Sequence, residues 1–256
     1  MEATYKNAPI SFTSQGTGNP LVLLHGFLES KEIWQDFVVE LSAKRQVICI
    51  DLPGHGESGN FAEVHTMADM AQAVKSVLDE LDIQQASFTG HSMGGYVSLE
   101  FQKIFPTIIN SLVLVNSTPQ ADSEERKANR HRAATLVLKN KRAFVSMAMS
   151  NLLTPENNKI FKSQIDILKK RALQFSSTGI YAAIKGMKIR TDHTELFAKF
   201  QGQKIVVAGK NDPVLEHNTI KNLAKRCNSK FYSLPDGHLS FLENQTELRE
   251  ILHLID

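Results

Sequence analysis

The stretch with the clearest chemical meaning is Gly90-His91-Ser92-Met93-Gly94-Gly95, which contains a G-x-S-x-G pattern centred on Ser92. It directly follows the apolar run Ala86–Thr89 and leads straight into a helical pattern. A serine on a sharp strand-to-helix turn exposes its hydroxyl, and glycines on either side leave room for neighbouring backbone. The helix N-terminus adds positive potential beneath the turn. The pattern predicts Ser92 as a nucleophile.

A serine is a weak nucleophile without a base and a carboxylate that orients the base. Along chains with this elbow, the acid and then the histidine follow later strands. Asp212 lies in a loop after the apolar run Ile205–Ala208, and His238 lies in a loop after Phe231–Leu234. We therefore predict Asp212 as the orienting acid and His238 as the general base.

Other carboxylates and histidines fit these roles less well. Asp236 lies only two residues before His238 in the same loop, and Asp192 precedes its strand, but both remain alternatives for the acid. His25, Asp51 and His55 lie in turns after strands and are interpreted as structural, with His25 bracing its loop. The histidines that lie in helical patterns or follow no strand are His65, His131, His193, His217 and His253.

A second loop fits the stabilisation of negative charge on a reacting oxygen. The apolar run Leu21–Leu24 leads into the tight turn His25-Gly26-Phe27. Backbone N–H groups of such a loop and of the residue after the nucleophile form an oxyanion hole. We expect Phe27 and Met93 to supply these two groups.

The elements that must position these residues alternate between strand and helix. The apolar runs are continuous, which is typical of parallel strands covered on both faces. They are Leu21–Leu24, Val47–Ile50, Ala86–Thr89, Ser111–Val115, Ile205–Ala208 and Phe231–Leu234. Helical patterns lie between them at Lys31–Ala43, Met67–Leu81, Ser92–Phe105 and Val214–Cys227. Two extended stretches, Thr4–Lys6 and Ile10–Ser14, predict an antiparallel hairpin at the sheet edge.

The alternation stops after Val115, where about seventy residues without a strand pattern exceed any normal connection. The sequence thus predicts an α/β fold with a mostly parallel central sheet flanked by helices and an inserted helical cap. Residues 1–118 and 191–256 would form the core, and residues 119–190 the cap over the sheet's carboxyl edge. Helical patterns within the cap are Arg132–Lys141, Phe144–Leu153 and Ile160–Phe175, with a boundary at Thr154-Pro155.

Composition is that of an ordinary soluble globular protein. Hydrophobic residues make up 42% and charged residues 22%, and the net charge of +2 gives no general argument for nucleic acid or membrane partners. The N-terminus lacks the apolar core of a secretory signal, and no stretch approaches the roughly eighteen apolar residues of a membrane helix. We expect a cytoplasmic protein.

Neither a metal nor a cofactor is predicted. The histidines show no H-x-x-x-H spacing, and no phosphate loop of the G-x-x-x-x-G-K type is present. The two cysteines, Cys49 and Cys227, are too few for a disulfide framework, and Cys49 lies in the apolar run Val47–Ile50. Its thiol is expected to be structural.

Charge is distributed unevenly along the chain. Residues 120–190 contain 15 Lys or Arg and 5 Asp or Glu, a net charge of +10 that leaves −8 for the rest. Solvated helix faces are the ordinary interpretation, and guidance of anionic substrates is the alternative. An apolar group in the same segment is expected mainly to pack, with methionines available to line a pocket. It comprises Phe144, Val145, Met147, Met149, Leu152 and Leu153, beside Arg126, Arg130 and Arg132.

The motifs HGF, DLPGHGESG, GHSMGG, GKNDPV and DGH, in this order between Leu21 and His238, resemble the α/β-hydrolase superfamily. That superfamily includes carboxylesterases, lactonases, thioesterases, carbon–carbon bond hydrolases, epoxide hydrolases and haloalkane dehalogenases. The last two classes typically use an aspartate at the elbow, so Ser92 argues against them. Menaquinone-pathway lyases have similar elbows but usually place an arginine where this chain has Tyr96.

The resemblance implies a carboxylesterase-like serine hydrolase that cleaves a small-molecule ester, or a related acyl bond, through an acyl-enzyme on Ser92. Other chemistries with the same triad stay open, namely those of a carbon–carbon bond hydrolase, a thioesterase or a lyase. A hydrolase-like ligand sensor with an intact triad is a further alternative, because a fold does not fix function.

Overall fold

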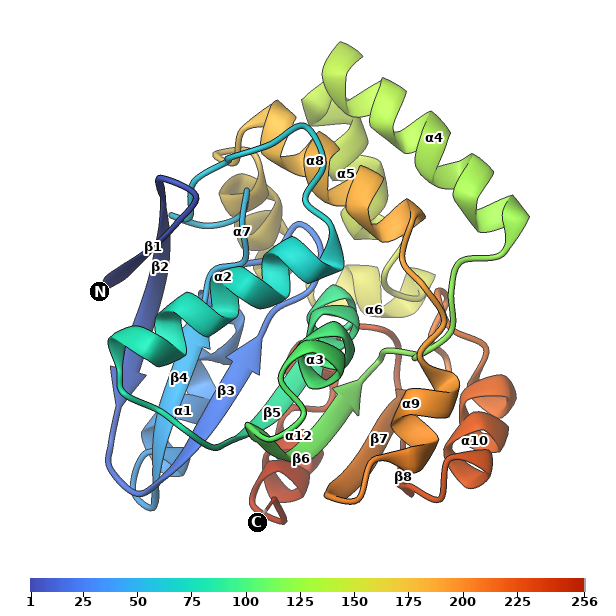
Figure 1. Ribbon diagram of the computed structural model, residues 1–256. Coiled ribbons are helices and arrows are strands. Elements are labelled where there is room, and N and C mark those ends of the chain that lie inside the picture. Colours follow the sequence, from blue (N-terminus) through green and yellow to red (C-terminus); the bar gives the residue numbers. More distant parts are fainter. Residues whose placement is uncertain (256) are drawn as a thin grey trace.

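One central sheet of eight strands organises the molecule, with helices on both of its faces (Figure 1). The computed structural model describes residues 1–255. The strands lie in the order β1-β2-β4-β3-β5-β6-β7-β8, and those from β4 to β8 run parallel. Their bounds are β1 Glu2–Tyr5, β2 Ala8–Gln15, β3 Asn19–Leu24, β4 Arg45–Ile50, β5 Ala86–His91, β6 Ile109–Val115, β7 Gln203–Gly209 and β8 Lys230–Leu234. The predicted fold class is confirmed.

The antiparallel hairpin at the sheet edge is confirmed as well, with bounds a few residues wider than expected. Strands β1 and β2 pair antiparallel, and β2 pairs antiparallel with β4. The turn between β1 and β2 consists of Lys6 and Asn7, which both have positive φ, 47° and 63°. Two positive φ angles match the right-handed twist of the flanking strands, as in type I′ hairpin turns.

Helices cover the sheet on both sides, so its apolar strands are buried on both faces, as the continuous patterns predicted. In Figure 1, α2, α3 and α9 lie in front of the sheet, and α1 and α12 lie behind it. Helix α3 contacts β5, and α12 is hydrogen-bonded to α1 through Gln245 and Asp36. The helices outside residues 119–190 are η1 Lys31–Trp34, α1 Gln35–Leu41, α2 Met67–Glu80, α3 Met93–Ile104, α9 Thr194–Lys199, α10 His217–Arg226, α11 Ser240–Glu243 and α12 Gln245–Leu252.

Two predicted helices begin differently in the structure. The segment Lys31–Ala43 starts with the 3₁₀ turn η1 before α1, and the backbone N–H of Lys31 donates to Asp51. The segment predicted from Val214 becomes helical only at His217. There, the N–H groups of Val214 and Leu215 donate to the Asp212 carboxylate, so a turn around that side chain replaces the first helical turn.

Between β6 and β7 the chain forms helices above the edge where the parallel strands end (Figure 1). Helix α4 packs against α8 and α5. The Thr154-Pro155 boundary is confirmed, because Thr154 caps a helix whose first residue is Pro155. The assignment of residues 119–190 as a separate cap stays a prediction. The helices are α4 Glu124–Lys139, α5 Lys141–Ser150, α6 Pro155–Ile160, α7 Lys162–Ala172 and α8 Ser177–Lys188.

The predicted helical stretches of this segment are shifted or divided in the structure. Helix α4 begins eight residues before the expected Arg132, because the Ser123 hydroxyl accepts the Arg126 N–H and caps it there. The stretch expected at Ile160–Phe175 is divided at Phe161 into α6 and α7. Apolar periodicity alone therefore located the helices better than their ends.

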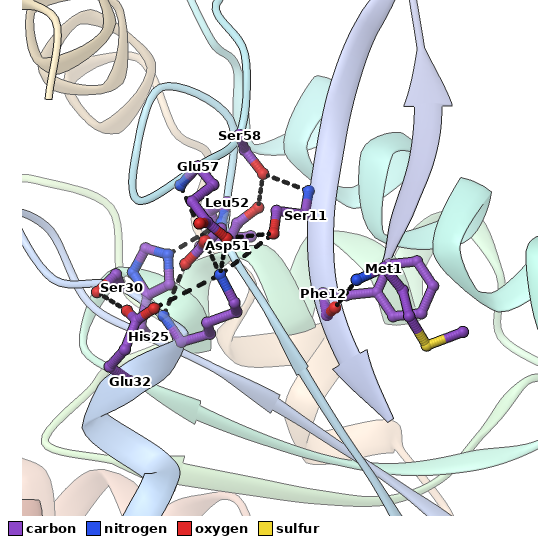
Figure 2. A network of polar contacts seen from close by, with 11 residues as sticks. Met1, Ser11, Phe12, His25, Ser30, Glu32, Asp51, Leu52, Glu57 and Ser58 are labelled. Carbon is purple, nitrogen blue, oxygen red and sulfur yellow. Dashed lines mark hydrogen bonds and ion pairs between the residues drawn. The ribbon is translucent and has the colours of Figure 1, made fainter. Parts of the chain in front are cut away.

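A polar network that runs from buried to exposed side chains fixes the loop after β3, the loop that contains the expected oxyanion donor (Figure 2). The Lys31 ammonium lies 2.7 Å from both Asp51 and Glu57. Burial by itself lowers the pKa of Lys31, but these carboxylates more than offset it and raise that pKa. His25 accepts the Leu52 N–H at 2.9 Å and donates to the Gly26 carbonyl, so it braces the loop as predicted.

Candidate active site

Ser92 lies on the turn between β5 and α3, as the motif predicted. Its backbone has φ 49° and ψ −111°, a conformation that residues with a side chain rarely adopt. A Cβ at Gly90 would collide with the backbone of Gly94, and one at Gly94 with the carbonyl of Leu24. Both glycines are therefore required by close backbone approach, and the turn presents the hydroxyl at the carboxyl edge of the sheet.

The structure brings Ser92, His238 and Asp212 together from three separate loops. His238 Nε2 lies 3.0 Å from Ser92 Oγ, and His238 Nδ1 lies 2.8 Å from Asp212 Oδ2. The His238 and Asp212 side chains are almost fully buried. A hydroxyl, an imidazole and a carboxylate in this order can remove the hydroxyl proton and stabilise the resulting charge.

The two alternative acids lie elsewhere. Asp236 binds the side-chain amides of Asn157 and Asn244 at 3.1 and 2.8 Å. Asp192 accepts the N–H of Thr194 in the turn before α9. The geometry therefore favours Asp212 over both, although its catalytic role stays a prediction.

A cavity of about 260 Å³ opens onto Ser92 and His238. Its polar lining comprises Glu29, Ser92, Arg126, Asn129, Arg130 and His238. Its apolar lining comprises Phe27, Leu28, Tyr96, Ala133, Ala148, Leu152, Met187 and Val214. A mainly apolar cavity with a few convergent polar groups is the common design of small-molecule sites.

A model of the α/β hydrolase fold matches residues 19–245, which is most of the chain. The chain belongs to the α/β-hydrolase fold family. Among solved structures, this α/β hydrolase is similar to a thermophilic esterase from Thermogutta terrifontis, with 28% identity, a TM-score of 0.91 and coverage of 96% of this chain and 92% of that one.

Curated relatives match over shorter or more divergent stretches. A dihydrolipoyllysine-residue acetyltransferase component of an acetoin cleaving system from Pseudomonas putida is 43% identical over 100 residues, 39% of this chain and 27% of that protein. A putative carbamate hydrolase from Serratia proteamaculans is 26% identical over 226 residues, 86% of this chain and 80% of that protein. The first two curated relatives are matched over only 27% and 39% of their own length.

The carboxylate of this α/β hydrolase's Asp212 is held by four donors. Oδ1 accepts the N–H groups of Val214 and Leu215 at 2.7 and 3.0 Å, and Oδ2 accepts from His238 and from Asn116 Nδ2 at 3.1 Å. Burial by itself raises the pKa of Asp212, but His238 and these N–H groups more than offset it. The pKa lies below its usual value, so the carboxylate stays charged at neutral pH.

Asn116 is a site residue that sequence reasoning missed. It follows β6 directly, has φ 46°, and donates to both Asp212 Oδ2 and the Gly237 carbonyl at 3.1 Å. It thereby connects the loop that contains Asp212 to the loop that contains His238. Its position after a strand was the available signal, although an asparagine there has no characteristic motif.

A second missed pair, His91 and Glu29, lies directly behind Ser92. His91 Nδ1 lies 2.9 Å from Glu29 and its Nε2 lies 2.8 Å from the His238 carbonyl, while Glu29 also accepts the Gly26 N–H at 2.6 Å. Both ring nitrogens face acceptors, which requires a doubly protonated imidazolium.

The electrostatics of this pair agree with its geometry. Burial by itself lowers the pKa of His91, but the Glu29 carboxylate more than offsets it and the pKa is raised. Burial by itself raises the pKa of Glu29, and His91 more than offsets it, so that pKa is lowered. The buried ion pair ties the Gly26 loop, the elbow and the His238 loop together.

The two residues expected to form the oxyanion hole come from the loop after β3 and from the start of α3. Phe27 lines the cavity from the loop after β3, and its ring packs 6.2 Å from that of Phe144. Met93 is the first residue of α3 and is fully buried. Their role as donors stays a prediction.

The segment between β6 and β7 directly contacts the loop that contains His238. The backbone N–H of His238 donates to the Leu152 carbonyl at 3.3 Å. Asn157 donates to Glu243 at 2.7 Å as well as to Asp236. Of the apolar group expected to pack, Phe144, Val145, Met149 and Leu153 are buried, Leu152 lines the cavity, and Met147 is exposed.

Within residues 1–255, no group of three or more His, Cys, Asp or Glu residues is placed to hold a metal ion. Cys49 and Cys227 are both free and buried, and burial raises the pKa of the Cys49 thiol to about 12. Over the same residues, no helix combines the length and apolar character needed to cross a membrane.

Proposed function

We propose that this α/β hydrolase is a serine hydrolase that cleaves a small-molecule carboxylic ester through an acyl-enzyme on Ser92. The observation that carries the proposal is the continuous line from Ser92 Oγ to His238 Nε2 and from His238 Nδ1 to Asp212, at 3.0 and 2.8 Å. Ser92 and His238 line the cavity described above, where an ester carbonyl would reach Ser92.

In the proposed first half-reaction, Ser92 Oγ attacks the ester carbonyl carbon while its proton passes to His238 Nε2. The carbonyl oxygen then carries the negative charge, and the N–H groups of Phe27 and Met93 would stabilise it. Loss of one such donor costs about 3 kcal/mol in comparable sites. When the carbon–oxygen bond to the alcohol breaks, His238 returns the proton to the leaving alcohol.

In the second half-reaction, a water molecule gives a proton to His238 and its oxygen attacks the acyl carbon. Collapse of this intermediate breaks the bond to Ser92 Oγ, which takes back the proton, and the carboxylic acid leaves. Throughout, Asp212 holds the proton of His238 on Nδ1 and stabilises the imidazolium. Its lowered pKa keeps the carboxylate charged for this task.

The relatives support a hydrolytic function of this kind. The structural relative from Thermogutta terrifontis is described as an esterase, and the relative from Serratia proteamaculans as a putative carbamate hydrolase. Both activities break an acyl bond. The mainly apolar cavity favours short to medium apolar acyl groups.

Labelling with a fluorophosphonate, followed by a panel of p-nitrophenyl esters from acetate to octanoate, tests the proposal. We expect labelling and repeated turnover in the wild type. Ser92→Ala should remove both, with kcat lowered about 10⁶-fold. Ser42→Ala, at a half-buried position at the end of α1 where the hydroxyl donates to the Val39 carbonyl, is the matched control and should behave as wild type.

Each competing function has its own outcome in this experiment. Turnover that survives Ser92→Ala would refute the nucleophile assignment. Labelling of Ser92 with no more than a few slow cycles on every ester would instead indicate a ligand sensor. Cleavage of thioesters or of diketones in preference to all oxygen esters would move the function to a thioesterase or a carbon–carbon bond hydrolase.

A further inference from the structure

Two arginines of α4 lie on one face of the helix and line the cavity that contains Ser92. Arg126 and Arg130 are four residues apart, so their side chains project in the same direction. Asn129 lines the cavity beside them. Two other cations of α4 do not line the cavity: Lys127 pairs with the exposed Glu124, and the exposed Arg132 donates to Asn129 Oδ1.

The positive charge at this wall exceeds what its one buried carboxylate requires. Asp122 is fully buried and lies 2.6 Å from Arg130, 2.6 Å from Arg190 and 3.8 Å from Arg126. Three guanidinium groups around one carboxylate leave a net charge of +2. The acidic group in the described lining, Glu29, is already paired with the imidazolium of His91.

Both guanidinium groups keep donors for a ligand while their positions are fixed. Arg130 uses Nε to bind Asp122, and Arg126 uses Nη2 to bind the Val214 carbonyl at 3.1 Å. Within residues 1–255 these bonds do not occupy all their N–H groups. The Arg126 side chain is 32% exposed and the Arg130 side chain 17%, so water screens their charges only in part.

A planar guanidinium fork matches a carboxylate, and a fork that is already held in place loses little rotamer freedom on binding. Neutralising Asp122 would need a single arginine. The second and third arginines, placed at the wall of the cavity, have no such structural requirement. An anionic group bound in the cavity would supply the counter-charge.

We propose that the natural substrate carries a carboxylate that Arg126 and Arg130 bind while its ester group lies at Ser92. This inference rests on the proposed ester hydrolysis and names the class of substrate. The apolar residues that line the rest of the cavity, such as Phe27 and Leu152, would then contact the carbon chain between the two groups.

The kinetic test compares esters that differ in one carboxylate. Monoethyl succinate, glutarate and adipate are each paired with the ethyl ester of a fatty acid of similar length, and the butyrate ester of glycolic acid is paired with propyl butyrate. The last pair places the carboxylate on the alcohol side. We expect kcat/KM to be at least tenfold higher for the carboxylated member of one or more pairs.

Arg126→Gln should lower that ratio about tenfold, because kcat/KM should fall more for the carboxylated ester than for its neutral partner. It leaves Arg130 and Arg190 in contact with Asp122, so the buried carboxylate keeps its closest partners. The matched control is Arg142→Gln, the same change at an exposed position of α5 outside the cavity lining, and it should leave the ratio unchanged. Ratios near one in all pairs, unaffected by Arg126→Gln, would overturn the proposal.

A binding experiment separates this inference from the proposed hydrolysis. Titration calorimetry of glutarate into Ser92→Ala measures anion binding without turnover. We expect binding that weakens about tenfold in Ser92→Ala/Arg126→Gln but not in Ser92→Ala/Arg142→Gln. Binding with this pattern but without ester turnover would refute only the hydrolysis. Turnover of neutral esters without Arg126-dependent binding would refute only the carboxylate site.

Discussion

Replacement of Asp212 by asparagine should prevent His238 from acting as a base while the protein stays folded. The reason lies in the hydrogen-bond donors around the carboxylate. Oδ1 accepts two backbone N–H groups, from Val214 and Leu215. An asparagine can satisfy both only by placing its oxygen there. Its NH₂ group must then occupy the position of Oδ2, where it faces His238 Nδ1.

An NH₂ group facing Nδ1 reverses the hydrogen bond. Nδ1 has to accept, so the proton of neutral His238 moves to Nε2, which faces Ser92 at 3.0 Å. The imidazole can no longer take the Ser92 proton. The opposite amide orientation is disfavoured, because it would leave two buried N–H groups without acceptors at a cost of about 1–3 kcal/mol each. The NH₂ group also faces the amide donor of Asn116.

The wrong tautomer lowers kcat by about four orders of magnitude in a serine hydrolase with this triad. That loss corresponds to about 5.5 kcal/mol of transition-state stabilisation. The assay is the steady-state rate on the best p-nitrophenyl ester, with circular dichroism and thermal unfolding to establish that the variant is folded.

Asp236→Asn is the matched control, since Asp236 lies two residues before His238 but binds Asn157 and Asn244 instead. We expect its kcat to stay within about tenfold of wild type, in contrast to the loss assigned to the triad acid. An Asp212→Asn variant with kcat within tenfold of wild type would refute the reasoning and transfer the role to Asp236 or Asp192.

Three further predictions follow from the same geometry. His238→Ala should reduce kcat as much as Ser92→Ala, and the double variant should be no slower than either, because triad members act as a unit; a much slower double variant would argue against it. Glu29→Gln should destabilise the protein most between about pH 4.5 and 6.5, the ordinary pKa values of Glu29 and His91. The lowered pKa of Glu29 means that its contribution is lost as pH falls through the folded-state value, and the raised pKa of His91 means that its contribution is lost as pH rises through its own. Urea unfolding of both proteins from pH 4 to 9 measures this difference, and a pH-independent difference would contradict it. Finally, the preference for a carboxylated ester should fall as ionic strength rises from 20 mM to 500 mM, because salt screens the partly exposed arginines; a salt-independent preference would exclude electrostatic guidance.

The sequence predicted the parts of the site that depend on local pattern. The G-x-S-x-G pattern around Ser92 identifies it directly, and Asp212 and His238 each follow an apolar strand within a few residues. The three residues could therefore be placed on one sheet edge before their distances were known. Residues whose roles depend on distant partners gave no such signal: His91 meets Glu29 across 62 positions and the His238 carbonyl across 147.

Helix ends were less predictable than helices for a related reason. The apolar pattern predicts that α10 begins at Val214. In the structure the N–H groups of Val214 and Leu215 donate to the Asp212 carboxylate instead, and the helix begins later. The same periodicity could not show that Arg126 and Arg130 face the cavity while Arg132 faces solvent. That distinction depends on how α4 packs against α8 and α5, which no single-helix pattern contains.

The bond from the His238 N–H to the Leu152 carbonyl limits how freely this family member can be re-engineered. Exchange of residues 119–190 as a block for those of a relative could displace the Leu152 carbonyl that accepts the His238 N–H, and would remove the Asn157 contacts to Asp236 and Glu243. Chimeras that retain residues 150–158 and vary only α4 and α8 should keep the base in position. Substrate range can then be altered through these two helices while the contacts that hold His238 are kept.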